Sequence, residues 1–176
     1  MRAAVTGSAW NRRAESERQL GMGMKRRTFS SCVWACAAWA KAPEGEPRAV
    51  EREVAAAINR EREREGLAAL GWSERVARVA RGHSEEMARG RYFGHEDLQS
   101  RRVSERLSGA GVRFRACGEN LYWQPGGAGL AEKALAGWMR SGGHRENLLG
   151  RAYRELGAGI AVDERGRWVV TLVVVG

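Results

Sequence analysis

The sequence predicts an α+β layered domain. Two segments with helical apolar spacing come first, a strand and a further helix follow, and two apolar runs with strand character end the chain. The 176 residues suffice for one domain with a packed core and are too few for two. We therefore expect a single domain in which helices and a sheet form separate layers.

The first two helices are predicted from apolar residues spaced three and four apart. Val50 and Ile58 mark the buried face of the first helix, which Gly66 ends. Ser73 is the expected N-cap of the second helix, whose apolar face also carries His83. A single histidine on such a face is more often a packed core residue than a ligand, so we expect His83 in the core.

The remaining elements alternate between helix and strand. In chain order we expect a short helix from Ser100 or Arg101, a strand over Val112–Trp123, a helix over Ala128–Met139, a break at Gly142-Gly143, a helical turn over His144–Leu149, and strands over Leu156–Val162 and Trp168–Val175. The last two strands are separated by only four residues, 163–166, which predicts a hairpin.

Basic charge is concentrated at the N-terminus. Residues 1–42 hold 8 Lys/Arg and 2 Asp/Glu, whereas residues 43–176 hold 22 and 19. The formal net charge of +9 therefore comes mostly from the N-terminal segment. The rest of the chain lacks the charge excess of a surface that follows a phosphate backbone, so we expect no nucleic-acid partner.

Residues 24–42 have the pattern of a secretory signal peptide. The basic triplet Lys25-Arg26-Arg27 precedes an apolar run from Phe29 to Ala40, and small residues follow. The run is too short to span a bilayer, so we expect export to the extracellular space or cell envelope, with no transmembrane segment in the mature chain. Arg26-Arg27 also resembles a twin-arginine signal. A basic amphipathic surface helix is the alternative.

The position of the leader defines the other expected segments of the chain. Residues 1–23 fit no part of a leader, and we expect a mis-called start or disorder there, with 43–49 as a linker and 50–176 as the folded domain. Cys32 and Cys36 lie in the leader, so only Cys117 survives cleavage and no internal disulfide can form. We expect Cys117 to be a small buried residue.

Three polar side chains are candidates for chemistry. His95 ends the turn Tyr92–His95, Glu119 lies in Gly118-Glu119-Asn120, and His144 lies in Ser141–Asn147. A carboxylate and imidazoles on separate elements can form a metal site, an acid–base pair or a buried structural network.

The motifs, taken in order, resemble the CAP superfamily (cysteine-rich secretory, antigen and pathogenesis-related proteins), in its short bacterial SCP-like branch. The resemblance covers Val50–Gly176 and rests on Asn59-Arg60, Gly66-Leu67, His83-Ser84 with Met87, Tyr92–His95, Arg106-Leu107, Gly118–Asn120, Trp138–Leu149 and Leu156–Gly159. It implies a three-layer α-β-α sandwich with a small antiparallel sheet.

The resemblance also implies a cleft floored by two histidines and two acids. His95, Glu119 and His144 match three of these positions, whereas Ser141 stands where a Trp-x-x-Glu pattern has the second acid. The implied ligand cleft is therefore His95, Glu119, Ser141 and His144. Its metal ligands are His95 and His144. No cofactor is required, and zinc or another divalent cation is an optional occupant.

The expected function is that of an exported binding or cell-envelope module whose cleft holds a divalent metal or a small ligand, with a lipid or a peptide as further candidates. The alternative is a metal-assisted hydrolase or protease in which Glu119 acts with His95 and His144, so Glu119 and His144 are the catalytic candidates. The missing second acid favours binding. So does the lack of Gly-x-Ser-x-Gly and His-Glu-x-x-His motifs in the sequence.

Two further interpretations stay open. Glu119 and His144 could form a buried structural network, with Asn120 and Asn147 capping loops. Cys117 lies two residues before Glu119, so strand alternation places both on one face and leaves a Cys–His nucleophile pair open as well.

Overall fold

The structure is a computed structural model and describes residues 46–176. The expected start or disorder at 1–23, the leader at 24–42 and the first part of the linker at 43–49 lie outside the described residues. The elements are α1 (Pro47–Arg64), β1 (Gly71–Trp72), α2 (Glu74–Gly90), α3 (Val103–Gly109), β2 (Cys117–Pro125), α4 (Leu130–Met139), α5 (Gly142–Leu149), β3 (Glu155–Val162) and β4 (Arg167–Val175).

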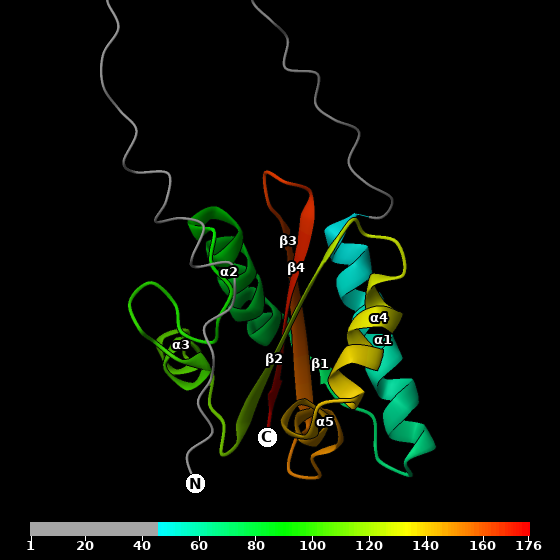
Figure 1. Cartoon of the computed structure of the whole chain (residues 1–176). Helices are drawn as coiled ribbons and strands as arrows, with labels where there is room; N and C mark the ends of the chain where they lie inside the picture. Colours follow the sequence, from blue (N-terminus) through cyan, green and yellow to red (C-terminus); the bar gives the residue numbers. More distant parts are fainter. Residues whose placement is uncertain (1–45) are drawn as a thin grey trace, which may run out of the picture. The chain divides into compact units, whose positions relative to one another are not determined.

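The predicted three-layer α+β sandwich is confirmed. A four-stranded sheet in the order β1-β3-β4-β2 forms the middle layer. Figure 1 shows α1 and α4 on one side of this sheet and α2 and α3 on the other. The three long strands pair antiparallel, as expected, but β1 pairs parallel with β3, so the sheet is mixed.

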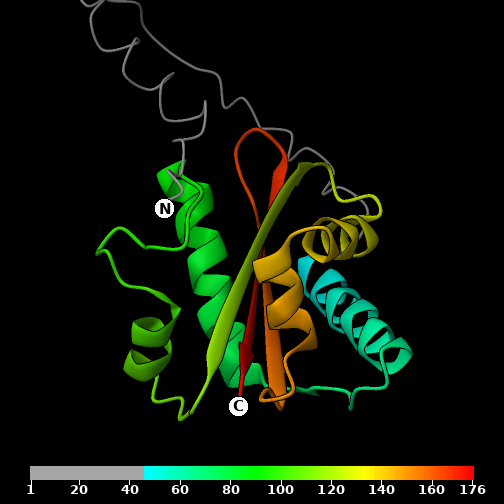
Figure 2. The ribbon, with the colours of Figure 1, turned by 60° about the horizontal axis from the view of Figure 1, so that its bottom comes forward.

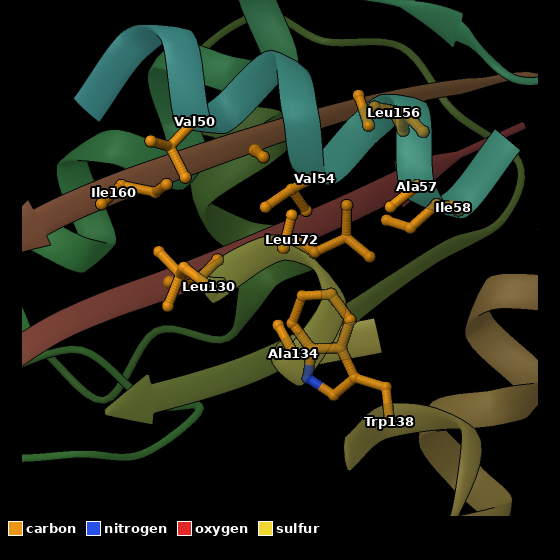
Figure 3. Packing of buried hydrophobic residues seen from close by; sticks show 14 of the residues in the cluster. Val50, Val54, Ala57, Ile58, Leu130, Ala134, Trp138, Leu156, Ile160 and Leu172 are labelled. Carbon is orange, nitrogen blue, oxygen red and sulfur yellow. The ribbon is translucent and has the colours of Figure 1, made fainter. Parts of the chain in front are cut away.

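Strand β4 carries apolar residues on both of its faces, so both faces of the sheet are covered by helices. Its residues are buried almost without interruption, which is typical of a strand packed on both sides. Leu172 and its even-numbered neighbours contact α1 and α4, whereas Val173 and Val175 contact α2 and α3. Figure 3 shows the first of these clusters, where Val54 of α1 and Trp138 of α4 enclose Leu172.

Helix α2 packs unusually close to β3. A Cβ atom at Gly157 would lie 2.2 Å from the backbone nitrogen of Ala77, and one at Gly159 would lie 2.1 Å from that of Arg81. The two glycines are two residues apart on one face of β3, and their helix contacts are four residues apart on one face of α2. The Leu156–Gly159 motif is therefore explained by helix–sheet packing.

Two expected boundaries are wrong. Strand β2 begins at Cys117 and not at Val112, because its partner β4 ends at Val175, which pairs with Cys117. Gly142-Gly143 do not break the helical segment but begin α5. The break lies at Ser141, whose extended backbone separates α4 from α5.

The expectations for His83 and Trp138 hold, whereas Cys117, which was expected to be buried, is only partly buried. His83 lies in the core with 2% of its surface exposed, and Trp138 is equally buried, with its Nε1 donating to the Leu121 backbone oxygen at 2.9 Å. In the part of the chain described, no helix is long and apolar enough to cross a bilayer.

Candidate functional site

The candidate residues come from elements on the two flanks of β2. Glu119 lies in β2, His95 in the irregular segment between α2 and α3, and His144 in the first turn of α5. Figure 2 shows β2 passing between α3 and α5, both of which contact it. The fold thus brings together residues that are up to 49 positions apart in the sequence.

Glu119 and His95 are joined by a hydrogen bond. His95 Nδ1 lies 2.9 Å from Glu119 Oε1, with the Glu119 side chain 3% exposed and that of His95 55% exposed. Because a carboxylate accepts, Nδ1 carries the proton, which leaves Nε2 of a neutral His95 free to accept or to bind a cation. A carboxylate that fixes the tautomer of an imidazole is the arrangement found behind metal-binding histidines.

Arg106 is the residue that sequence reasoning missed. Its Nη2 donates to Glu119 Oε2, and its Nη1 donates to the backbone oxygens of His95 (3.0 Å) and Arg101 (2.7 Å). One buried guanidinium thus holds the carboxylate and also the backbone that carries the first histidine. The only sequence signal was Arg106-Leu107 in the series of family-like motifs.

His144 faces His95 across the site. The two ring centres are 6.5 Å apart, with the planes inclined at 39°. Burial, and secondarily the charge of His95, lower the pKa of His144 below its usual 6.5, so this imidazole is neutral at pH 7. Asn120 Nδ2 donates a hydrogen bond to the backbone oxygen of His144 at 2.9 Å, and this bond links α5 to β2.

The polar network around Glu119 differs from the one expected. Glu119 pairs with His95 and Arg106, whereas no hydrogen bond between Glu119 and His144 is found within residues 46–176. Asn147 does not cap a loop. Its Nδ2 donates to the Glu119 backbone oxygen at 3.2 Å and to Asn120 Oδ1 at 2.8 Å. The two asparagines therefore join α5 to β2 directly.

Gly118 is required by the same junction. A Cβ atom at this position would lie 2.4 Å from Asn147 Oδ1 and 2.9 Å from the hydroxyl oxygen of Tyr153. In the Gly118-Glu119-Asn120 motif, Gly118 allows Asn147 to approach the β2 backbone closely, Glu119 forms an ion pair with Arg106, and the Asn120 side chain forms hydrogen bonds to α5.

Ser141 lies at the N-cap of α5. Its backbone nitrogen donates to the Trp138 backbone oxygen at 3.1 Å, and its side chain makes no capping hydrogen bond. No carboxylate stands at this position, so the site has one acid and not two.

Cys117 is poorly suited to nucleophilic chemistry. Burial, and secondarily the negative charge of Glu119, raise the pKa of its thiol. A raised pKa disfavours the reactive thiolate, so the Cys–His pair loses support.

The donor set fits at most an open cation site. Across residues 46–176, no group of three or more His, Cys, Asp or Glu is placed to hold a metal ion. Two imidazoles on one tetrahedral zinc, each with a Zn–N distance of about 2.0 Å, have ring centres roughly 5 Å apart. The ring centres of His95 and His144 are 6.5 Å apart, farther than this spacing, and the His95 side chain is 55% exposed.

The aromatic residues expected near the site differ in exposure. Trp138 belongs to the core, while Phe93 and Trp123 are 40% and 45% exposed. Tyr92 donates its hydroxyl hydrogen to Glu86 Oε2 at 2.9 Å, and its ring meets His83 edge-on. Of the expected aromatic residues, Phe93 and Trp123 are thus the most accessible to a ligand.

Solved structures support the fold. An extracellular protein containing an SCP domain from Bacillus anthracis is 32% identical, with a TM-score of 0.64, over 73% of this chain and 41% of that one. An outer surface protein from Borrelia burgdorferi has a TM-score of 0.67 at 14% identity, over 74% and 95% of the two chains, and this likeness concerns the fold alone.

Two proteins of Bacillus subtilis (strain 168) are similar in sequence. The uncharacterized membrane protein YlbC is 37% identical over 112 residues, which are 62% of this chain and 31% of YlbC. The uncharacterized protein YkwD is 30% identical over 111 residues, 63% of this chain and 42% of YkwD. The match thus spans less than half the length of either relative.

A family model gives the decisive comparison. The model described as the cysteine-rich secretory protein family, CAP, matches residues 55–175, which include every candidate site residue. With the motifs and the sandwich fold, this match leads to one conclusion: the chain belongs to the CAP family.

Proposed function

We propose that this protein is an exported CAP-domain module that binds a ligand at the cleft of His95, Glu119, Ser141 and His144 and does not hydrolyse it. The observation that carries the proposal is the engagement of both carboxylate oxygens of Glu119, one by His95 and one by Arg106. A general base must reach a substrate or water proton. A carboxylate that is 3% exposed, with one oxygen bonded to His95 and the other to Arg106, is placed instead to orient His95.

Export is supported by two independent observations. Residues 24–42 have the composition of a secretory leader, and the similar Bacillus anthracis protein is described as extracellular. We propose residues 50–176 as the mature domain, and the family model matches residues 55–175 within it.

A divalent cation such as zinc is the occupant that can be tested most directly. His95 Nε2 and an imidazole nitrogen of His144 would hold it, and a bound cation would polarise water or a ligand oxygen. Two features favour this assignment: the carboxylate of Glu119 fixes the tautomer of His95, and His144 is neutral at pH 7.

Calorimetric titration with zinc tests the cation site. Cys32 and Cys36 would compete as thiolate ligands, so the full chain carries Cys32→Ser and Cys36→Ser in every sample. We expect saturable heat that His144→Ala abolishes. His83→Gln serves as the control that removes the third histidine of the chain, and it should retain the heat. A flat titration of the parent, or an unchanged titration of His144→Ala, contradicts the cation assignment.

The hydrolase alternative makes the opposite prediction for Glu119. It requires that zinc-loaded protein cleave a peptide or an ester and that Glu119→Gln abolish the cleavage. We expect no cleavage by either protein. Hydrolysis that depends on Glu119 would overturn the proposal of a binding module.

A further inference from the structure

An open surface cavity lies outside the candidate site, and none of the candidate site residues lines it. Its volume is about 580 Å³, within the range of small-molecule sites. Three arginines line it, Arg113 and Arg115 from the segment before β2 and Arg154 from the segment before β3, and no acidic side chain does. A concave surface with three guanidinium groups and no acidic side chain has the electrostatic character of an anion site.

None of these three arginines forms an ion pair to Asp or Glu within the described part of the chain, whereas nine other arginines there do. Ion pairs to Asp or Glu engage Arg52, Arg64, Arg81, Arg91, Arg101, Arg102, Arg106, Arg145 and Arg167. Within residues 46–176, the guanidinium groups of Arg113 and Arg115 have no hydrogen-bond or ion-pair partner. Their donors are therefore available to an external anion.

The local backbone fixes where these side chains stand. Phe114 packs into the cluster of Val76, Leu107 and Val173, so its neighbours Arg113 and Arg115 are exposed. The backbone nitrogens of Arg115 and Ala116 donate to the Gly176 oxygen at 2.5 and 2.9 Å and anchor this segment beside β4.

Arg154 is partly preorganised at the same cavity. Its Nη1 donates to the backbone oxygens of Arg151 at 2.6 Å and Tyr153 at 2.8 Å, which leaves its other donors unassigned. Gly176 also lines the cavity, and even with a terminal carboxylate there the three guanidinium groups leave a positive excess.

We propose that this cavity binds a phosphate ester. The planar guanidinium donates two parallel hydrogen bonds to phosphate oxygens, and three such groups around one concavity match a compact, multiply charged anion better than a single carboxylate. Phe114, Ala116 and Ala152 provide an apolar wall for the organic part. The three arginines form one cluster and not a stripe, which distinguishes this site from a nucleic-acid surface.

Nuclear magnetic resonance titration of the full chain with glycerol 3-phosphate tests the site. We expect saturable shifts of the backbone amides of Arg113, Arg115 and Arg154, and a Kd that rises as salt is added. Arg113→Gln with Arg115→Gln should weaken binding by about fivefold to twentyfold, the range for partly exposed charge pairs. The matched control Arg78→Gln with Arg140→Gln removes the same charge from two exposed positions and should leave Kd unchanged.

Vesicle binding identifies the source of the phosphate. Phosphatidylglycerol vesicles are compared with phosphatidylcholine vesicles, using the parent and both double variants, which share the same basic N-terminus. If only Arg113→Gln with Arg115→Gln loses vesicle binding, the ligand is a lipid headgroup. If this variant loses glycerol 3-phosphate and binds vesicles like the control, the ligand is soluble. The proposal is overturned if the control weakens both probes equally, or if the parent binds neither.

Discussion

Replacement of Arg106 by methionine should destabilise the protein more than any change at the histidines. The side chains of Arg106 and Glu119 are 7% and 3% exposed, so Arg106→Met leaves a buried carboxylate without its main partner. It also leaves the backbone oxygens of His95 and Arg101 without their shared donor. Removal of one partner from a buried ion pair costs about 3–5 kcal/mol, a large part of a typical stability of about 5–15 kcal/mol.

A double-mutant cycle separates the pair from its surroundings. Glu119→Gln keeps an oxygen that can accept from Arg106, so we expect a smaller loss of about 1–3 kcal/mol. The protein with both substitutions contains no buried charge at this place. It should therefore lose at least about 1 kcal/mol less than the sum of the single losses.

Urea unfolding followed by tryptophan fluorescence provides the measurement, since the chain has seven tryptophans, among them the buried Trp138 and Trp168. His95→Ala is the matched comparison, because His95 contacts the same carboxylate from a half-exposed position and should cost about 1 kcal/mol or less. Losses that add within about 0.5 kcal/mol would refute the claim that Arg106 and Glu119 form one energetic unit.

Two other predictions concern helix α2. Gly159→Ala places a Cβ 2.1 Å from the Arg81 backbone and should destabilise the protein by about 1–3 kcal/mol or more. Gly82→Ala has open space around it and should stabilise the protein by about 0.5–1 kcal/mol. Equal effects of the two substitutions in urea unfolding would contradict the packing argument. Burial holds the pKa of His83 below its usual 6.5, so the unfolded chain takes up the proton first as pH falls. The free energy of unfolding should therefore decrease below about pH 6.5, and His83→Gln should reduce this slope between pH 7.5 and 5.5; identical slopes for both proteins would speak against it.

The fold was predictable because its main patterns are local. The spacing of Val50, Val54 and Ile58 specifies the buried face of α1, and the four residues between the last strands specify the hairpin. Strand β1 was missed because its two residues are too few for a periodic pattern. The start of β2 was missed because it depends on where β4 ends, which is a non-local property.

The candidate site was predictable only in part. Family-like motifs led to His95, Glu119 and His144, and the structure brings these three together. Arg106 has no comparable local signal, since the described chain is rich in arginines that form ordinary surface pairs. The role of Arg106 depends on the packing of α3 beside β2, which brings Arg106 to Glu119. The residue spacing within α3 or β2 does not predict this tertiary contact.

Glu119 lies on β2, the strand at one edge of the sheet. Strand β2 is an edge strand, and such strands expose unpaired backbone groups that invite pairing with other chains. Here Asn147 donates to the Glu119 backbone oxygen and Trp138 donates to that of Leu121, so α5 and α4 cover carbonyl groups of β2 with side chains. Helix α5 carries both His144 and Asn147, and the Asn147 side chain donates to the Glu119 backbone oxygen. The same helix therefore protects the sheet edge and brings His144 beside His95.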